Sequence, residues 1–107
     1  MNKRMVLRRR IFGGNMLKKI TEGRVESDEG FSIHIIGLEV LRYEENGKSI
    51  ILDWTLDPKS KKMRIYVSDA LSWDKPTKEK LTVDDKNKII KNIKRAVVLL
   101  EGDYEVI

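Results

Sequence analysis

The chain has 107 residues, of which 40% are hydrophobic and 36% are charged. This length and composition are typical of one domain with one core, and no run is long and apolar enough to span a membrane. The chain has no cysteine, so no disulfide stabilises it. We expect a cytoplasmic protein, because the first residues carry arginines and lack the apolar segment of a signal peptide.

The formal net charge of +5 belongs to one end of the chain. Residues 1–15 hold five basic residues and no acidic one, which leaves 17 basic against 17 acidic residues in 16–107. We expect residues 1–15 to lie outside the fold, either disordered or upstream of a true start at Met16, since codons for the preceding Gly-Gly-Asn can resemble a ribosome-binding site. The alternative is a basic arm that binds nucleic acid or an acidic partner.

An acidic stretch opens the remaining domain. A short strand is expected around Ile20 to Val25. Four carboxylates then fall within residues 22–29: Glu22, Glu26, Asp28 and Glu29. Gly30 follows them, which predicts an exposed loop or hairpin with negative charge. A solvated turn and a partner-binding surface are both open interpretations of this stretch.

Alternating residues predict several antiparallel strands. Phe31 to Ile36 alternates as a half-buried strand does, and Gly37 predicts a bulge or a bend before the next alternating run. Asn46-Gly47 then lies between two alternating runs, which predicts a two-residue hairpin that pairs residues 42–45 with 48–51.

The next strand is expected from Ser49 to Leu56, with every second residue on the core face: Ile50, Leu52, Trp54 and Leu56. A proline-containing turn at 57–61 leads to a further alternating strand at 63–67. Residues 103–107 are either a closing strand or a tail. The pattern predicts an antiparallel meander of about five or six strands.

One long helix is predicted from Thr82 to Gly102. Its apolar residues recur at helical spacing: Ile89, Ile93, Ala96 and Leu100. Thr82 is a favourable N-cap, and Gly102 is a residue that commonly ends a helix. Because the helix and the meander each have one apolar face, we expect an α+β fold in which the helix packs across one face of the sheet. Residues 16–107 then form a single domain.

A polar connection at 68–81 joins the last predicted strand to the helix. Trp73 lies in it without any periodic core position, followed by Asp74. Tryptophan is common among interface anchors, so Trp73 is either an anchor for a partner or folded back over the sheet edge.

Catalysis is not expected from this sequence. It has one histidine, His34, and no nucleophile motif, glycine-rich phosphate loop or metal-ligand spacing. His34 alternates with apolar neighbours on a predicted strand, as a structural or surface histidine does. We therefore expect no enzymatic activity, no cofactor and no bound metal.

Nucleic acid is not the expected partner either. The predicted helix carries four cations on its outer face: Lys88, Lys91, Lys94 and Arg95. A solvated helix face routinely carries such residues, and the neutral balance of 16–107 removes the attraction expected of a phosphate binder.

The order of features from residue 41 onward resembles bacterial immunity proteins of polymorphic-toxin and contact-dependent inhibition systems. The matching features are Leu41 to Tyr43 before the Asn-Gly hairpin, Arg64-Ile65-Tyr66 on a strand, Trp73 and Pro76 in a W-x-x-P connection, and Leu81-Thr82 with Ile89-Ile90 at the helix. The resemblance is absent before Met16. It implies a non-enzymatic protein that binds the effector domain of a cognate toxin and protects the producing cell.

The candidate residues for the toxin contact are ordered by their charge, because the resemblance does not identify contact residues. Many such toxins are nucleases with basic clefts, so the first candidates are the four acidic residues: Glu22, Glu26, Asp28 and Glu29. Trp73 and Asp74 come second. The alternative function is a small nucleic-acid-associated regulatory domain that uses the basic N-terminal arm. We expect a monomer or a small homo-oligomer.

Overall fold

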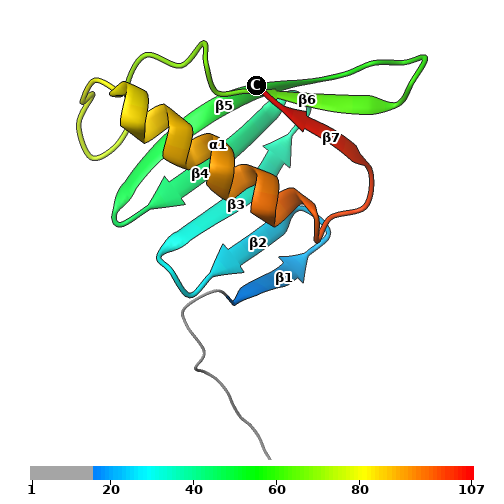
Figure 1. Cartoon of the computed structure of the whole chain (residues 1–107), viewed down its shortest axis with the longest axis horizontal. Helices are drawn as coiled ribbons and strands as arrows, with labels where there is room; N and C mark the ends of the chain where they lie inside the picture. Colours follow the sequence, from blue (N-terminus) through cyan, green and yellow to red (C-terminus); the bar gives the residue numbers. More distant parts are fainter. Residues whose placement is uncertain (1–15) are drawn as a thin grey trace, which may run out of the picture.

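One helix crosses one face of a curled sheet in the computed structural model, which describes residues 16–107 (Figure 1). The basic segment 1–15 and its proposed role lie outside the described residues. The elements within 16–107 are β1 (Leu17–Thr21), β2 (Arg24–Ser27), β3 (Phe31–Gly37), β4 (Val40–Glu45), β5 (Lys48–Leu56), β6 (Lys62–Tyr66), α1 (Val83–Val97) and β7 (Asp103–Val106). The seven strands are ordered in the sheet as in the sequence. The α+β class with one C-terminal helix is confirmed.

Local turn chemistry sets the register of the central strands. Asn46 and Gly47 both have positive φ, at 50° and 85°, as the predicted hairpin requires. Arg42 therefore pairs with Ile51, as expected. The register of β3 against β4 shifts between Ile35 and Gly37, which is where a bulge or bend was predicted. All neighbouring strands are antiparallel except β6 and β7, which are parallel.

The sheet formed by residues 16–107 has seven strands, and the prediction of about five or six was wrong. The strand expected around Ile20 to Val25 is interrupted, because Glu22 and Gly23 form a turn between β1 and β2. The turn makes a hairpin out of what was taken for one strand. Residues 103–107 supply the closing strand, since β7 pairs with β6 over all four of its residues.

The core lies between α1 and the face of the sheet that the alternation predicts. Ile89, Ile93 and Ala96 of α1 are fully buried, as are Ile33 and Tyr43 of the sheet. Burying one large apolar side chain is worth about 1.5–3 kcal/mol, so this contact is a main source of stability. At the far end of β5 the prediction fails: the hairpin of β5 and β6 projects past α1 (Figure 1), and Leu56 is half exposed.

A capping box starts α1 at the predicted residue. The Thr82 hydroxyl accepts a hydrogen bond from the Asp85 amide at 3.0 Å, and the Asp85 carboxylate accepts one from the Thr82 amide at 2.9 Å. The helix ends at Val97 and not, as predicted, near Gly102. A turn follows, in which Leu100 remains buried because its amide bonds back to the Val97 carbonyl at 3.0 Å.

Within residues 16–107, no helix combines the length and the apolar character that crossing a membrane requires.

Candidate functional site

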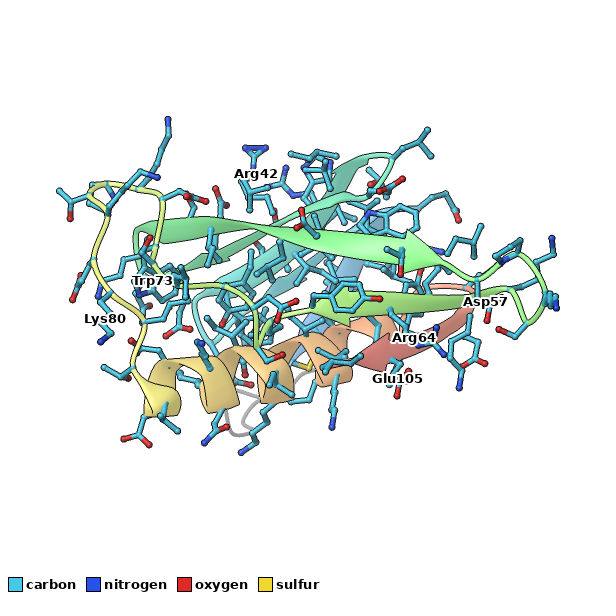
Figure 2. All side chains as sticks on the ribbon, turned by 90° about the horizontal axis from the view of Figure 1, so that it is seen from above. Arg42, Asp57, Arg64, Trp73, Lys80 and Glu105 are labelled. Carbon is cyan, nitrogen blue, oxygen red and sulfur yellow. The ribbon has the colours of Figure 1, made fainter. Side chains whose placement is uncertain are left out.

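The face of the sheet away from α1, here called the open face, carries polar and charged side chains. Figure 2 shows Arg42 on this side, with α1 on the other. Alternation explains the separation, because the neighbours of the buried Leu41 and Tyr43 in β4 must point the opposite way. A rigid sheet thus presents these polar side chains in a fixed order.

A cationic row crosses three strands of the open face. Arg24 of β2 is opposite His34 of β3, and His34 is opposite Arg42 of β4. Side chains directly opposite each other have Cβ atoms about 4.5–5.5 Å apart, and like charges in such positions repel. Arg24 and Arg42 therefore flank His34 on its two sides, each from a neighbouring strand.

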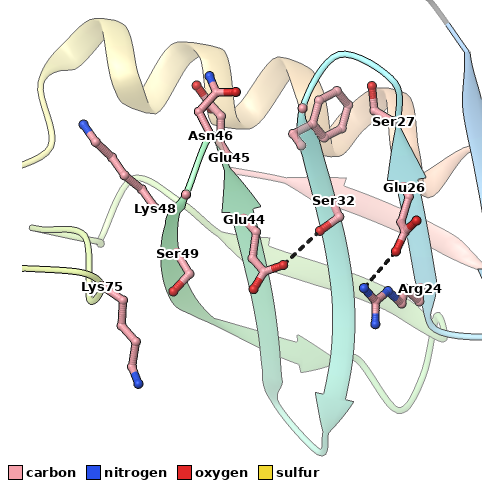
Figure 3. A pocket seen from close by; sticks show the side chains of 13 residues that line it. Arg24, Glu26, Ser27, Ser32, Glu44, Glu45, Asn46, Lys48, Ser49 and Lys75 are labelled. Carbon is pink, nitrogen blue, oxygen red and sulfur yellow. Dashed lines mark hydrogen bonds and ion pairs between the residues drawn. The ribbon is translucent and has the colours of Figure 1, made fainter.

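An acidic row runs beside the cationic row on the same three strands. Glu26 of β2 is opposite Ser32 of β3, and Ser32 is opposite Glu44 of β4. The Ser32 hydroxyl donates to Glu44 Oε1 at 3.4 Å, and Arg24 Nη2 lies 2.8 Å from Glu26 Oε2 (Figure 3). The two rows together, Arg24, His34 and Arg42 with Glu26, Ser32 and Glu44, are called the charge ladder below.

The charge ladder leaves cationic groups without partners. Arg42 makes no ion pair with any residue of 16–107. The Nε–H group of Arg24 is buried and has no acceptor among the same residues. A small hollow of about 80 Å³ lies between the rows, lined by Arg24, Ser32, His34, Arg42 and Glu44.

A larger groove of about 530 Å³ opens at one end of the ladder. It lies between the β2–β3 turn, the Asn46-Gly47 hairpin and Lys75 of the connection (Figure 3). The charged residues of this groove are of both signs: Arg24, Glu26, Glu44, Glu45, Lys48 and Lys75. The hairpin and the turn are joined by a hydrogen bond from the Asn46 amide to the Gly30 carbonyl at 3.0 Å, which fixes the width of the groove.

The four predicted acidic residues do not form one surface. Glu22 lies in the β1–β2 turn, at the opposite end of β2 from Asp28 and Glu29. The stretch is a strand with a turn at each end, so its carboxylates are spread along it. Only Glu26 lines the groove. Asp28 lies in the β2–β3 turn, and its carboxylate accepts a hydrogen bond from the Met16 amide at 3.2 Å.

Glu29 is engaged inside the molecule. Its carboxylate forms a two-point contact with the Arg95 guanidinium of α1, with one N–O distance of 3.1 Å. This hydrogen bonding lowers the pKa of Glu29. The same guanidinium lies 5.6 Å from the centre of the Phe31 ring. Glu29 therefore fastens the β2–β3 turn to the helix, and it is a less available contact than Glu26.

Trp73 is buried, with 3% of its surface exposed, so its side chain does not offer a free anchor to a partner. The ring centre lies 6.3 Å from that of Tyr43, and Lys48 Nζ lies 5.6 Å above it. The alternative, that Trp73 folds back over the sheet edge, is confirmed. Its indole N–H has no acceptor among the described residues.

The buried position of Trp73 follows from an open strand edge. β6 pairs with β5 only from Asp53 onward, which leaves the first half of β5 without a neighbour on that side. The connection covers this edge: Ser49 bridges to Lys75, and the Asp74 carboxylate accepts a hydrogen bond from the Ile51 amide at 2.7 Å. Asp74 is thus a structural residue next to the groove.

Sequence reasoning missed the charge ladder. Its members occupy the polar positions of alternating strands, and alternation separated His34 from its apolar neighbours but assigned no face to Arg42. No local signal gave the pairing of β2 with β3, however, because the β1–β2 turn was not recognised. The helix cations are less free than their sequence pattern suggests, since Lys88 pairs with Glu45 at 2.8 Å and Arg95 with Glu29.

The described residues contain no group of three or more histidine and carboxylate side chains placed to hold a metal ion. Comparisons with protein-family models, with curated proteins and with solved structures gave no match.

Proposed function

We propose that this protein is an immunity protein, which binds the effector domain of a cognate bacterial toxin in the cytoplasm and blocks it without catalysis. The observation that supports the proposal best is the groove beside the charge ladder. It is a preformed, polar, charged hollow on a rigid sheet, next to a connection that is pinned to β5. Binding to a preformed surface loses less conformational entropy, which favours tight inhibition.

Glu26 and Glu44 are the residues we assign to the toxin contact. Both line the groove, Glu26 on the open face of β2 and Glu44 on the open face of β4. A nuclease effector has a basic cleft for its substrate, and carboxylates facing such a cleft raise the association rate and disfavour other partners. Arg42, which has no ion pair among the described residues, provides a cation for an acidic rim around that cleft.

The test is capture of the partner by the full-length tagged chain from a lysate of the source bacterium. The groove variant Glu26→Lys/Glu44→Lys reverses the two assigned charges. The control variant Glu22→Lys/Glu101→Lys makes the same change in net charge at two exposed residues away from the groove. We expect the wild type and the control to retain the same C-terminal domain of a large secreted protein and the groove variant to lose it.

The captured domain is then purified and its activity is measured against increasing amounts of the chain. Stoichiometric inhibition is the expected result. Capture of nucleic acid alone, removable by a nuclease, would overturn the proposal in favour of the regulatory alternative. Equal capture by the groove variant would show that the groove is not the contact.

A further inference from the structure

The charge ladder has a geometry that is complementary to itself. Each of its three strands contributes one residue to the cationic row and, two positions along, one to the acidic row. The pairs are Arg24 with Glu26, His34 with Ser32, and Arg42 with Glu44. The rows are therefore parallel and about 7 Å apart, the span of two strand residues.

A second copy can be placed face to face with the first by a twofold axis. This axis runs parallel to the two rows, midway between them, in the plane where the two copies touch. This rotation exchanges the rows, so the cationic row of one copy lies over the acidic row of the other. Because both rows cross the same strands, Arg42 meets Glu44 of the second copy and Arg24 meets Glu26. His34 meets Ser32, whose hydroxyl can accept or donate.

The spacing of stacked sheets suits these contacts. Sheets packed face to face are about 10 Å apart, and their strands cross at about −30°. Arginine and glutamate side chains from opposite sheets reach across this gap. Ile51, which is opposite Arg42 in β5 and 44% exposed, adds apolar surface at the edge of the contact.

From this arrangement we infer that the free protein associates with a second copy of itself through the charge ladder, as a twofold face-to-face dimer. Arg42 gains an ion pair that it lacks among residues 16–107, whereas Arg24 exchanges its contact with Glu26 of the same strand for one with the second copy. The attraction is mainly between partly solvated charges, so salt weakens the dimer.

Self-association does not depend on the proposed function. Glu26 and Glu44 also line the groove, so a second copy and a toxin domain exclude each other. The dimer is then the state of the protein in the absence of toxin. It can be tested with the chain alone, so a failure of the dimer and a failure of toxin binding are separate results.

The experiment is sedimentation velocity of the full chain over a concentration series at low salt. Arg42→Glu places carboxylates opposite Glu44, and Glu44→Arg places guanidinium groups opposite Arg42. We expect each variant alone to be monomeric. In an equimolar mixture the two variants are complementary at both ladder positions, so we expect the dimer to return. Lys59→Glu, a charge reversal in the exposed β5–β6 turn, keeps the dimer.

Circular dichroism of each variant confirms that it is folded. If a variant is not folded, the test uses the wild type instead. Its sedimentation is measured at increasing salt concentration, and we expect the dimer to be lost. A wild type that is monomeric at every concentration overturns the inference. A dimer that persists in both single variants, or at high salt, also overturns it. A mixture of the two folded variants that stays monomeric overturns it as well.

Discussion

At the scale of single residues, the Tyr43 hydroxyl joins the helix to the sheet inside the core. It donates to Glu45 Oε1 at 2.6 Å and accepts from Asn92 Nδ2 of α1 at 2.8 Å. Lys88 Nζ completes the network 2.8 Å from Glu45 Oε2. Burial raises the pKa of Tyr43, so the hydroxyl remains a neutral donor.

Tyr43→Phe should therefore lower the free energy of unfolding by about 1–3 kcal/mol, because the buried amide of Asn92 loses its acceptor. Urea denaturation measures this change. Tyr66→Phe is the matched control, since its hydroxyl bonds to Thr55 at 2.9 Å in an exposed position and its loss should cost no more than about 0.5 kcal/mol. Equal effects of the two substitutions would contradict the buried network.

The contact between Glu29 and Arg95 predicts a pH dependence. The pKa of Glu29 is lower in the folded protein than in the unfolded chain, mainly because Arg95 donates hydrogen bonds to the carboxylate. Its contribution is therefore complete above the unfolded pKa and is lost as pH falls through the folded pKa. The wild type should be more stable than Glu29→Gln at neutral pH, and the difference should vanish in acid.

Urea titrations of both proteins across the acidic range measure that difference. Glu22→Gln is the control, since Glu22 is highly exposed and its contact with Lys19 is 3.5 Å long. It should change stability little at any pH. A Glu29 difference that persists unchanged in acid would show that the carboxylate charge is not its source.

At the scale of the elements, the capping box of α1 is testable by one substitution. Thr82→Ala removes the hydroxyl that accepts from the Asp85 amide, and it should cost about 0.5–2 kcal/mol. Thr77→Ala, in the exposed part of the connection, is the matched control and should have little effect. Thermal and urea unfolding measure both. A Thr82→Ala protein as stable as the control would show that the cap is dispensable.

The glycine between β2 and β3 fixes the end of the groove. Gly30 has φ +96°, and a Cβ atom there would lie 2.6 Å from Asn46 Oδ1. Gly30→Ala should destabilise the fold by about 1–3 kcal/mol, mainly through backbone strain at positive φ, while the Asn46 side chain moves aside. Gly37→Ala is the control, since no atom lies within 4 Å of its Cβ position and its φ is not positive. Similar unfolding midpoints for the two variants would argue against this role of Gly30.

Local signals predicted the elements where one residue type decides the structure. Asn46-Gly47 set a register, Gly37 marked a bulge and Thr82 marked the start of α1. The β1–β2 turn was missed because Glu22 and Gly23 were included in one strand expected from Ile20 to Val25. The end of α1 was misplaced because Leu100 continues the apolar period although it already lies in a turn.

At the scale of the whole molecule, the candidate site depends on pairings that no local pattern contains. Glu26 was predicted from its charge, and it does line the groove. Apart from Arg24, the other members of the charge ladder come from β3 and β4, so only the assembled sheet brings Arg42 and Glu44 onto the same face as Glu26. The burial of Trp73 depends on the assembled sheet in the same way, since it follows from the open edge of β5.

The proposal of an immunity function is tested most directly by growth protection. The captured effector domain is expressed inside a susceptible bacterium together with the full chain or one of its variants. We predict normal growth with the wild type and with Glu22→Lys/Glu101→Lys, and arrest with Glu26→Lys/Glu44→Lys. Arrest in the presence of the wild type would contradict the immunity function, and growth with the groove variant would contradict the assigned contact.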